Sequence, residues 1–318
     1  MSRALWYVAP GRAELRDAPG RAPGPGEASV RTLWSTLSRG TERLVLTGGV
    51  SDPERMRAPM QEGEFPYPVK YGYCAVGRVE AGPAGLVGRA VFALHPHQEA
   101  FVAPLNALAP LPDGVPPRRA VLAANLETAL NALWDSGVGP GDKVAVVGAG
   151  PVGLLVAFLV AGMPGTDVTV VDVERARRPI VESFGARFRR PLDGPEACDA
   201  VFHASATAAG LACALACAGD GATVTELSWY GAAPVAAPLG LDFHSRRLRL
   251  ISSQVGALPP ARLPRWTHRR RLLKALDLLA DPRLDALITG EVAFAHLPEA
   301  LPSLLAPGAE GLCTAIRY

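Results

Sequence analysis

The sequence predicts an α/β protein in which a small β-rich domain is followed by a doubly wound parallel sheet. Up to about residue 118 the chain is rich in Pro and Gly and contains short β-prone runs, which is typical of a small, irregular β domain. From Lys143 onward, short apolar runs alternate with helical stretches, as in a parallel sheet covered by helices on both faces. A GxGxxG motif from Gly148 to Gly153 stands directly after the first of these runs, which favours a nucleotide-binding sheet.

The composition indicates a folded protein whose partner is a small molecule. At 318 residues the chain is long enough for two domains, and 49% apolar with 19% charged residues excludes general disorder. A net charge of +2 gives no strong field for nucleic acid or for a membrane surface. No apolar run reaches membrane-spanning length and no secretory signal is visible, so we expect a cytoplasmic protein whose five cysteines are reduced thiols.

In the first domain, four β-prone runs predict strands, and one long helix follows them. The predicted strands are residues 28–34, 77–80, 90–94 and 100–102. From Pro117 to Ser136, Ala, Leu and Trp recur at three and four residues, which predicts a helix. The turn-forming segment from Gly137 to Asp142 separates this helix from the second domain.

The second domain is predicted as strands and helices in alternation, followed by a shorter C-terminal part. The predicted strands are residues 143–147, 167–171, 199–204, 222–227 and 248–252. The predicted helices between them are residues 151–163, which Pro164 ends, and 208–218. Later in the chain we expect helices at 269–279 and 297–305 and a closing strand at 312–318.

The glycine motif predicts a dinucleotide site of the Rossmann type. Gly148 permits a tight turn, Gly150 lets the backbone approach a pyrophosphate, and Gly153 lets the helix pack closely on the strand. Pro151 and Val152 open the helix, whose amino end offers unpaired amides and a positive dipole to the phosphates. Cofactor binding is therefore assigned to these five residues.

An acidic residue follows the second predicted strand of this domain. Asp172 stands at the distance from Gly153 at which an acid holds the adenosine ribose hydroxyls in such folds. Its carboxylate would repel a 2′-phosphate, which favours NAD over NADP. Arg177, with Arg175 and Arg178, follows at once and would offset this charge, so NADP stays open.

Three metal-capable side chains alternate within residues 93–102. His95, His97 and Glu99 would share one face of an extended segment, so this stretch could hold a metal ion. Pro96 distorts the strand between the two histidines, which favours a hydrogen-bonded His95 instead.

Three further motifs frame the glycine turn. Pro23-Gly-Pro-Gly-Glu27 precedes a strand, Gly139-Pro-Gly-Asp-Lys-Val144 precedes the turn, and Ser38-Arg-Gly-Thr-Glu42 lies between them. With a β-rich domain ahead of the nucleotide domain, this order resembles the medium-chain dehydrogenase/reductase superfamily. The resemblance implies a GroES-like catalytic domain at 1–122, a Rossmann domain at 123–258, and a segment at 259–318 that returns to the catalytic domain. It also implies a homodimer formed through the sheet edge near residues 222–255.

By the same resemblance, the positions that bind catalytic zinc in this superfamily hold no zinc ligand. The first position is Ser38 or Arg39, the second is Tyr73 and the third is Ala124. We therefore assign no metal, because catalytic zinc needs three protein ligands besides water. The alternative is a relocated site formed by His95, His97, Cys74 and Glu127.

The resemblance also implies roles for residues around the lost zinc position. Tyr73 would point its phenol into the cleft, or else fill the space that zinc left, and Thr41 matches a hydroxyl that relays a proton. His97 would border the substrate. Glu127 and Thr128 open the helix that runs past the nicotinamide in the superfamily, and Val255 is expected to contact the cofactor. The predicted catalytic residues are thus Tyr73, Thr41, His97 and Glu127.

These observations predict a zinc-independent, NAD(H)-dependent oxidoreductase that transfers hydride between nicotinamide and a small-molecule alcohol or carbonyl. Without zinc, hydrogen-bond donors must stabilise the charge that develops on the substrate oxygen. Three other hypotheses stay open. They are an NADPH-dependent enone or quinone reductase, a nucleotide-binding sensor or structural protein without turnover, and a dehydrogenase with a relocated metal.

Overall fold

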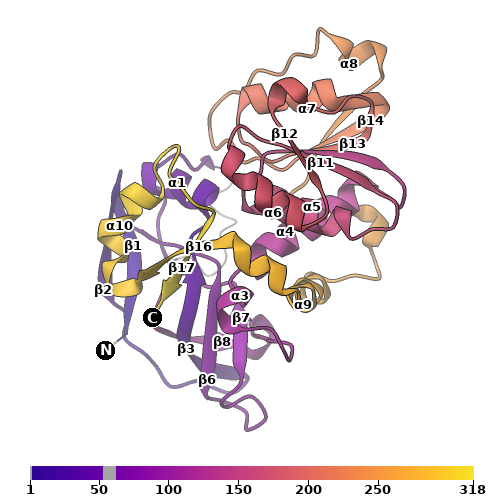
Figure 1. The fold of residues 1–318 in the computed structure, drawn as a ribbon. Helices are drawn as coiled ribbons and strands as arrows, with labels where there is room; N and C mark the ends of the chain where they lie inside the picture. Colours follow the sequence, from indigo (N-terminus) through magenta and orange to yellow (C-terminus); the bar gives the residue numbers. More distant parts are fainter. Residues whose placement is uncertain (1, 53–61) are drawn as a thin grey trace. The chain divides into compact units, whose positions relative to one another are not determined.

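The structure is a computed structural model of the 318-residue chain, and it describes residues 2–52 and 62–318. The chain divides into two compact units. Unit 1 comprises Met1–Ala124 and Leu272–Tyr318, and unit 2 comprises Asn125–Arg271. Figure 1 shows this division by colour, since unit 1 combines the indigo and yellow ends of the chain.

Unit 1 contains two β-sheets and short helices. Its strands are β1 (Arg3–Ala9), β2 (Arg12–Asp17), β3 (Glu27–Thr36), β4 (Glu62–Gly63), β5 (Val69–Lys70), β6 (Ala75–Ala81), β7 (Ala90–Ala93), β8 (Ala100–Pro104), β9 (Ala109–Pro110), β16 (Ile288–Ala293) and β17 (Cys313–Arg317). Its helices include α1 (Arg39–Thr47), α3 (Pro117–Ala120) and α10 (Leu297–Leu304). The seven-stranded sheet has the order β16-β17-β3-β6-β7-β9 with β8 paired to β3, and the four-stranded sheet has the order β2-β1-β5-β4.

The long strand β3 shows why this sheet forms. Ala28, Val30 and Thr32 are buried, while Arg31 between them is exposed, so alternate side chains face the core and the solvent. Val79 on β6 and the neighbouring strands β7 and β8 complete the same apolar cluster. This sheet therefore has one dry face, against which the rest of unit 1 packs.

Unit 2 is a six-stranded parallel sheet with the order β12-β11-β10-β13-β14-β15. Its strands are β10 (Lys143–Val147), β11 (Asp167–Val171), β12 (Arg187–Arg189), β13 (Cys198–His203), β14 (Ala218–Glu226) and β15 (Arg249–Ser252). Its helices include α5 (Pro151–Ala161), α6 (Arg178–Ser183), α7 (Ala208–Cys217) and α8 (Asp242–Ser245). Helices α4 (Ala123–Ser136) and α9 (His268–Leu278) carry the chain across the two unit boundaries.

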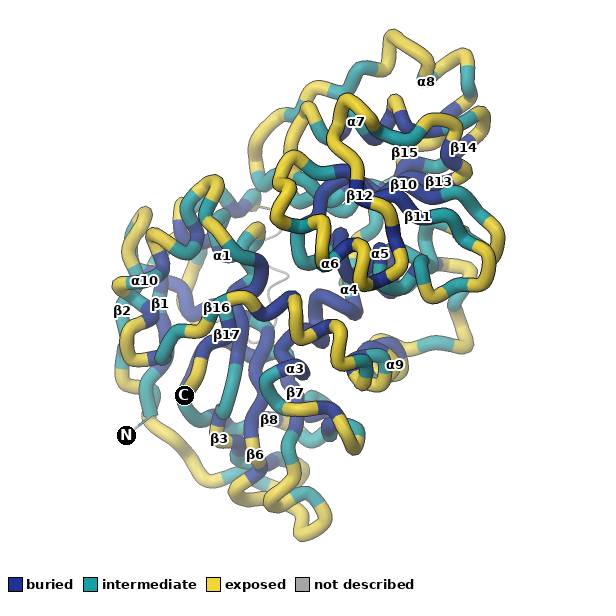
Figure 2. Tube along the Cα trace, in the orientation of Figure 1, coloured by how far each residue is buried: buried dark blue, intermediate teal, exposed yellow. Residues whose placement is uncertain are grey.

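The strand order identifies a doubly wound nucleotide-binding sheet. The chain starts in the middle with β10, moves outward to β12, and then returns to add β13, β14 and β15 on the other side. The central strands are apolar throughout because both faces are covered, and Figure 2 shows β10 and β13 among the buried elements. The change of direction between β10 and β13 is where ligands bind in such sheets.

The predicted fold class is confirmed, and the strands predicted in the second domain are present. The helix predicted from Pro117 to Ser136 is instead two helices, α3 and α4, separated by a turn at 121–122. Arg119 of α3 is held within unit 1 by Asp285, at 2.8 and 2.6 Å, whereas most of α4 belongs to unit 2. The helix therefore breaks where the chain changes units.

The β1–β2 hairpin and helix α1 were not predicted from the sequence. β2 is polar and half-exposed, so its composition carries no strand signal. Helix α1 begins after Ser38, a residue type typical of N-caps, and that signal was available. The return to the first domain was expected at residue 259, but residues 259–271 belong to unit 2.

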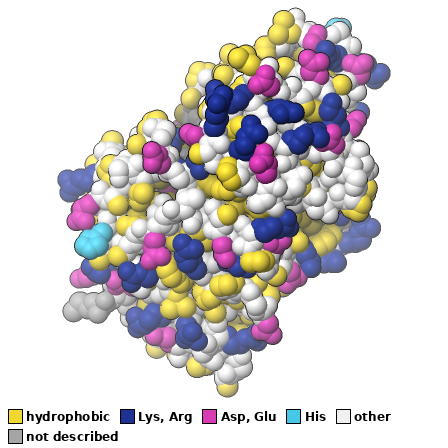
Figure 3. Space-filling view, viewed as in Figure 1, with side chains coloured by type: hydrophobic (Ala, Val, Ile, Leu, Met, Phe, Trp, Pro, Cys, Tyr) yellow, Lys and Arg dark blue, Asp and Glu magenta, His cyan; other side chains and the backbone are white. Residues whose placement is uncertain are grey.

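Acidic and basic side chains are interspersed over the face seen in Figure 3. Among the described residues, we find no helix that combines the length and apolar character needed to cross a bilayer.

Candidate active site

The glycine turn of unit 2 has the geometry of a phosphate-binding turn. Gly148 has φ +110, and a Cβ there would lie 2.8 Å from the backbone of Ala204 and Ser205. A Cβ at Gly153 would overlap the carbonyl oxygen of Gly148, so the first turn of α5 packs directly on the end of β10. Open space surrounds Gly150, where no atom lies within 4 Å of a built Cβ. A ligand can therefore approach the backbone at that one position.

Helix α5 begins at this turn without a side-chain cap. Gly150 is its N-cap residue and has no side chain with which to accept a hydrogen bond. Pro151 donates no N–H and instead fixes the helical φ at the first position. The amides of Val152 and Gly153 have no acceptor within the helix, and they lie at the positive end of its dipole. This end of α5 fits an anionic pyrophosphate.

Asp172 lies directly after β11, at the same edge of the sheet. Its Oδ2 accepts a hydrogen bond from the Ala149 amide at 2.5 Å, and its Oδ1 accepts one from the Glu174 amide at 2.7 Å. The carboxylate is thus held beside the glycine turn and keeps acceptor capacity for a ribose hydroxyl. Arg175 and Arg177 follow in a short 3-10 helix, close enough in the chain to meet a 2′-phosphate.

Glu127, predicted as catalytic, lies in a buried ion pair of unit 2. Its Oε1 accepts a hydrogen bond from Arg271 Nε at 3.0 Å, and both side chains are nearly inaccessible. Burial raises the pKa of Glu127, although Arg271 opposes that shift. Arg271 also donates to the side chain of Asn131 and to the carbonyl of Val255. Through Arg271, Glu127 connects α4 to the segment at Val255. Its carboxylate is therefore not free for acid–base chemistry, which corrects the predicted catalytic role.

Thr128 and Val255, the remaining two predicted cofactor contacts, are both partly exposed. Thr128 is partly exposed on α4, one residue beyond Glu127. Val255 is partly exposed, and its carbonyl is already occupied by Arg271. A contact between Val255 and a cofactor would have to use its amide or its side chain.

Tyr73 and Thr41 lie together in unit 1. The partly exposed phenol of Tyr73 lies near the hydroxyls of Thr41 and Ser38, which come from the first turn of α1 and its N-cap. Burial raises the pKa of Tyr73 well above its usual value and outweighs the opposing effect of these two hydroxyls. The phenol therefore keeps its proton at neutral pH and remains a hydrogen-bond donor.

His97 is fully buried in unit 1 and does not form a substrate wall. Its side chain is 0% exposed, with Nδ1 2.9 Å from Ser35 Oγ and Nε2 3.0 Å from Glu42 Oε2. Glu42 also accepts hydrogen bonds from the Tyr7 hydroxyl at 2.6 Å and from the Ser38 amide at 2.7 Å. Both ring nitrogens of His97 are engaged, so any role in chemistry passes through Glu42 and Ser38.

Gly72 makes room for the buried histidine. It has φ +125, and a Cβ there would lie 2.8 Å from His97 Cδ2 and 2.9 Å from the His97 amide nitrogen. The His97 amide in turn donates to the Tyr71 carbonyl at 3.2 Å. Tyr73 therefore follows a backbone position that only glycine occupies without strain.

The donor set around Tyr73 does not fit zinc. Of the positions that correspond to zinc ligands, Ser38 and Tyr73 offer only hydroxyls, which are not among zinc's usual Cys, His and carboxylate ligands, and Ala124 has no donor atom. Arg39 is turned to the carbonyls of Ala309 and Gly311. Across residues 2–52 and 62–318, no group of three or more His, Cys, Asp or Glu side chains is arranged to hold a metal ion.

The alternative relocated metal site is not formed. His95 stacks on Phe101 with ring centroids 3.8 Å apart, and its Nδ1 lies 2.9 Å from the carbonyl oxygen of Pro96. Burial lowers the pKa of His95 to about 4. With His97 bound to Glu42 and Glu127 bound to Arg271, three of the four proposed ligands are committed elsewhere.

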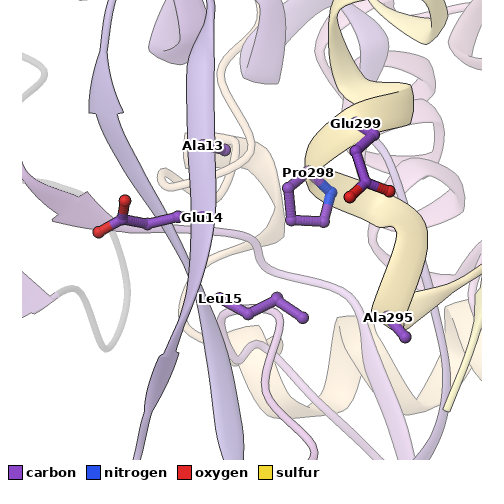
Figure 4. A pocket seen from close by; sticks show the side chains of 6 residues that line it. All are labelled: Ala13, Glu14, Leu15, Ala295, Pro298 and Glu299. Carbon is purple, nitrogen blue, oxygen red and sulfur yellow. The ribbon is translucent and has the colours of Figure 1, made fainter.

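Two hollows on the surface do not carry the chemistry. One, of about 400 Å³, lies between β2 and α10 in unit 1 and is lined by Ala13, Glu14, Leu15, Ala295, Pro298 and Glu299. In Figure 4 the Glu14 carboxylate points away from Pro298, so polar groups do not converge there. The other is lined mainly by surface arginines near α8 and β15.

Several residues near the Tyr73 cluster of unit 1 and at the sheet edge of unit 2 were not predicted from the sequence. Glu42 was present in the quoted Ser38-Arg-Gly-Thr-Glu42 element, but its partners Tyr7 and Ser35 are distant in sequence and carry no motif. In unit 2, His203 and Glu226 end the adjacent strands β13 and β14 and pair with each other. Polar residues at the ends of buried parallel strands were the available signal.

The chain is similar in sequence and in fold to known dehydrogenases. D-guloside 3-dehydrogenase of Escherichia coli K12 is 25% identical over 333 residues, which cover 93% of this chain and 94% of the relative. A protein of Sinorhizobium meliloti 1021 described as a zinc-binding dehydrogenase and solved with NADP superposes with a TM-score of 0.79 at 20% identity, over 100% of this chain and 99% of that one. An alcohol dehydrogenase of E. coli CFT073 solved with NADH gives a TM-score of 0.79 at 17% identity, again over 100% and 99%. No protein-family model matches the chain.

Proposed function

We propose that the protein transfers hydride between NAD(H) and a small-molecule alcohol or carbonyl, and that it does so without a catalytic zinc. The premise is that the chain belongs to the medium-chain dehydrogenase/reductase superfamily of NAD(P)-dependent oxidoreductases. The observation that carries the second half of this proposal is the Tyr73–Ser38–Thr41 cluster. It supplies neutral hydrogen-bond donors in the place where the superfamily's zinc ligands would stand.

Unit 2 would hold the dinucleotide. The amino end of α5 binds the pyrophosphate, Gly150 lets it approach, and the Asp172 carboxylate accepts from the ribose hydroxyls. The bound nicotinamide supplies or takes up the hydride. Because Asp172 would repel a 2′-phosphate, we propose that NAD(H) binds more tightly than NADP(H), with Arg177 as the residue that limits this preference.

Unit 1 would act on the substrate oxygen. Tyr73 keeps its proton, so its phenol donates a hydrogen bond to the oxygen on which negative charge develops as a carbonyl is reduced. Thr41 and Ser38 orient the phenol and offer hydroxyls through which a proton reaches the new alcohol. Glu42 positions Ser38 and its neighbours, because the Glu42 carboxylate accepts a hydrogen bond from the Ser38 amide.

The relatives favour a polyhydroxylated substrate. The E. coli relative that spans nearly the whole chain acts, by its name, on a guloside, and a shorter match is to L-galactonate-5-dehydrogenase. We therefore propose a sugar, a sugar acid or a polyol as the substrate class. We also propose a homodimer formed through β15, which is the edge strand of the unit 2 sheet.

Cofactor preference and metal independence can be tested together. Titration with NADH and NADPH should give tighter binding of NADH, and Asp172→Ala should remove the difference because the acceptor and the repulsion are lost together. NADH oxidation with a panel of keto-sugars, enones and quinones should favour the keto-sugars and should survive dialysis against a chelator. Tighter NADPH binding, or activity that tracks zinc content, would refute the corresponding part of the proposal.

A further inference from the structure

A second histidine–glutamate pair lies at the ligand-binding edge of unit 2. His203 is the last residue of β13 and is 0% exposed, and its Nδ1 lies 2.7 Å from Glu226 Oε2. Glu226 is the last residue of β14 and pairs in register with His203. Its side chain is 15% exposed, so the carboxylate reaches the surface of this edge.

The hydrogen bonds around the pair fix its charge. Glu226 Oε2 also accepts from the Tyr230 hydroxyl at 3.1 Å, and Oε1 accepts from the Ser228 amide at 2.7 Å. Burial raises the pKa of Glu226, but hydrogen bonds with His203 and Ser228 outweigh it and the pKa is lowered. Because Nδ1 faces a carboxylate, it carries the ring hydrogen, and Nε2 then accepts from the Ser205 hydroxyl at 2.7 Å. Glu226 therefore keeps a negative charge.

The order Ser205–His203–Glu226 matches that of a hydrolytic triad, but the serine has no room to react. Ser205 Oγ lies so close to Gly210, in the first turn of α7, that a Cβ at Gly210 would overlap it. Its other side is 3.1 Å from Thr207 Oγ1. The serine hydroxyl is packed as a structural hydrogen-bond partner, which leaves the exposed carboxylate as the functional end of the cluster.

The topology places this carboxylate on the nicotinamide side of the dinucleotide site. The glycine turn and Asp172 follow β10 and β11 and would take the pyrophosphate and the adenosine ribose. A dinucleotide bound across the switch point therefore extends over the carboxyl ends of β13 and β14, where His203 and Glu226 stand. The nicotinamide ring is positively charged when oxidised and neutral when reduced.

We infer that Glu226, held by His203, Ser228 and Tyr230, favours binding of the oxidised, positively charged nicotinamide over the reduced form. This inference rests on the proposed function, since it concerns the same dinucleotide site. The attraction acts on one redox form only, so it changes the ratio of the two affinities and not the affinity for the adenosine half. Glu226 is thus a residue that determines which redox form of the cofactor is retained.

The test measures dissociation constants of NAD⁺, NADH and ADP-ribose for the full chain by calorimetry. Glu226→Gln keeps the size of the side chain and removes its charge, so the preference for NAD⁺ should fall by roughly threefold to tenfold at low salt. ADP-ribose, which lacks nicotinamide, should bind unchanged. Asp220→Asn removes the same charge from the exposed opposite end of β14 and should leave the ratio unaltered.

An unchanged NAD⁺/NADH ratio in Glu226→Gln, with ADP-ribose bound as in the parent protein, would overturn the inference. If that variant does not fold, the double variant His203→Leu with Glu226→Met removes both partners together and should show the same fall in the ratio. A protein that binds none of the three ligands would instead refute the proposed function, and the inference with it.

Discussion

Each unit contains a histidine–glutamate pair whose histidine is fully buried, and these two pairs differ in their access to water. In unit 1, Glu42 and His97 are 1% and 0% exposed and are joined to Tyr7, Ser35 and the Ser38 amide. In unit 2, His203 is equally enclosed, but Glu226 is 15% exposed at the end of a strand. The same pair of residue types therefore serves two purposes. The enclosed carboxylate positions other groups, and the exposed one can meet a ligand directly.

Removal of the carboxylates should give the largest difference between the pairs. Glu42→Leu should lower the free energy of unfolding by about 3–5 kcal/mol, because His97, Tyr7 and the Ser38 amide lose a common acceptor in a dry interior. Glu226→Leu, the matched change, should cost roughly half as much or less, since water can replace part of what is lost. Urea unfolding measures both values. Equal losses would show that the difference in exposure has no energetic meaning.

The next test asks whether the enclosed pair supports chemistry. Tyr73→Phe removes the donor that Ser38 orients, so kcat should fall by about 10²–10⁴ while NADH binding and the urea midpoint stay unchanged. Tyr67→Phe is the control, because its hydroxyl donates at 2.8 Å to the Leu46 carbonyl and not to this cluster. A Tyr73→Phe enzyme with the parent rate would make Tyr73 a packing residue.

One glycine adjoins each pair, and the two should respond differently to a methyl group. Gly72→Ala meets the His97 backbone at 2.9 Å with φ +125 and should cost about 2–4 kcal/mol. Gly210→Ala meets only side-chain atoms. These are the hydroxyls of Ser205 and Thr207, which can rotate, and Nε2 of the enclosed His203 ring at 2.8 Å, and alanine is favoured over glycine in a helix by about 1 kcal/mol. Its cost should be at most about 1–2 kcal/mol. A reversed order in thermal or urea unfolding would contradict the close packing around His97.

His95 provides a comparison with a buried histidine that lacks a carboxylate partner. Burial lowers its pKa from 6.5 to about 4, so the unfolded chain binds a proton more readily than the folded chain between these values. Stability should therefore fall as the pH is lowered from 7 to 5, by about 2 kcal/mol from this group. His95→Phe, which can still stack on Phe101, should remove that part of the pH dependence. An identical pH profile in the variant would exclude His95 as its source.

Local patterns in the sequence predict the glycine turn of unit 2 because its parts are adjacent in the chain. The run Lys143 to Gly153 contains a strand, a turn and the start of a helix, so one motif determines the geometry around Gly148. Asp172 is a single strand away. Nothing comparable exists in unit 1, where His97 meets Glu42, 55 residues distant, and Ser35, 62 residues distant.

The misplaced residues were those whose partners lie far along the chain. Glu127 was assigned to catalysis from its position on a helix, but Arg271, 144 residues later, pairs with it. His97 was assigned to a substrate wall from the family resemblance, which implies that this loop borders the substrate cleft, and alternation in a strand predicts a face and not a depth. Depth depends on what covers the strand, and here Gly72 and Glu42 bring other segments over the ring.

The division of unit 1 between the two ends of the chain has a consequence for biosynthesis. β17 pairs with β3 through Ala315 opposite Thr36, so the seven-stranded sheet has to wait for nearly the whole chain to be made before it is complete. Unit 2 is continuous and can fold while the last segment is still being synthesised. Until β17 arrives, the end of β3 from Trp34 to Thr36 offers unpaired backbone groups to any other strand. The nascent protein is therefore most exposed to aggregation after its nucleotide-binding half has folded.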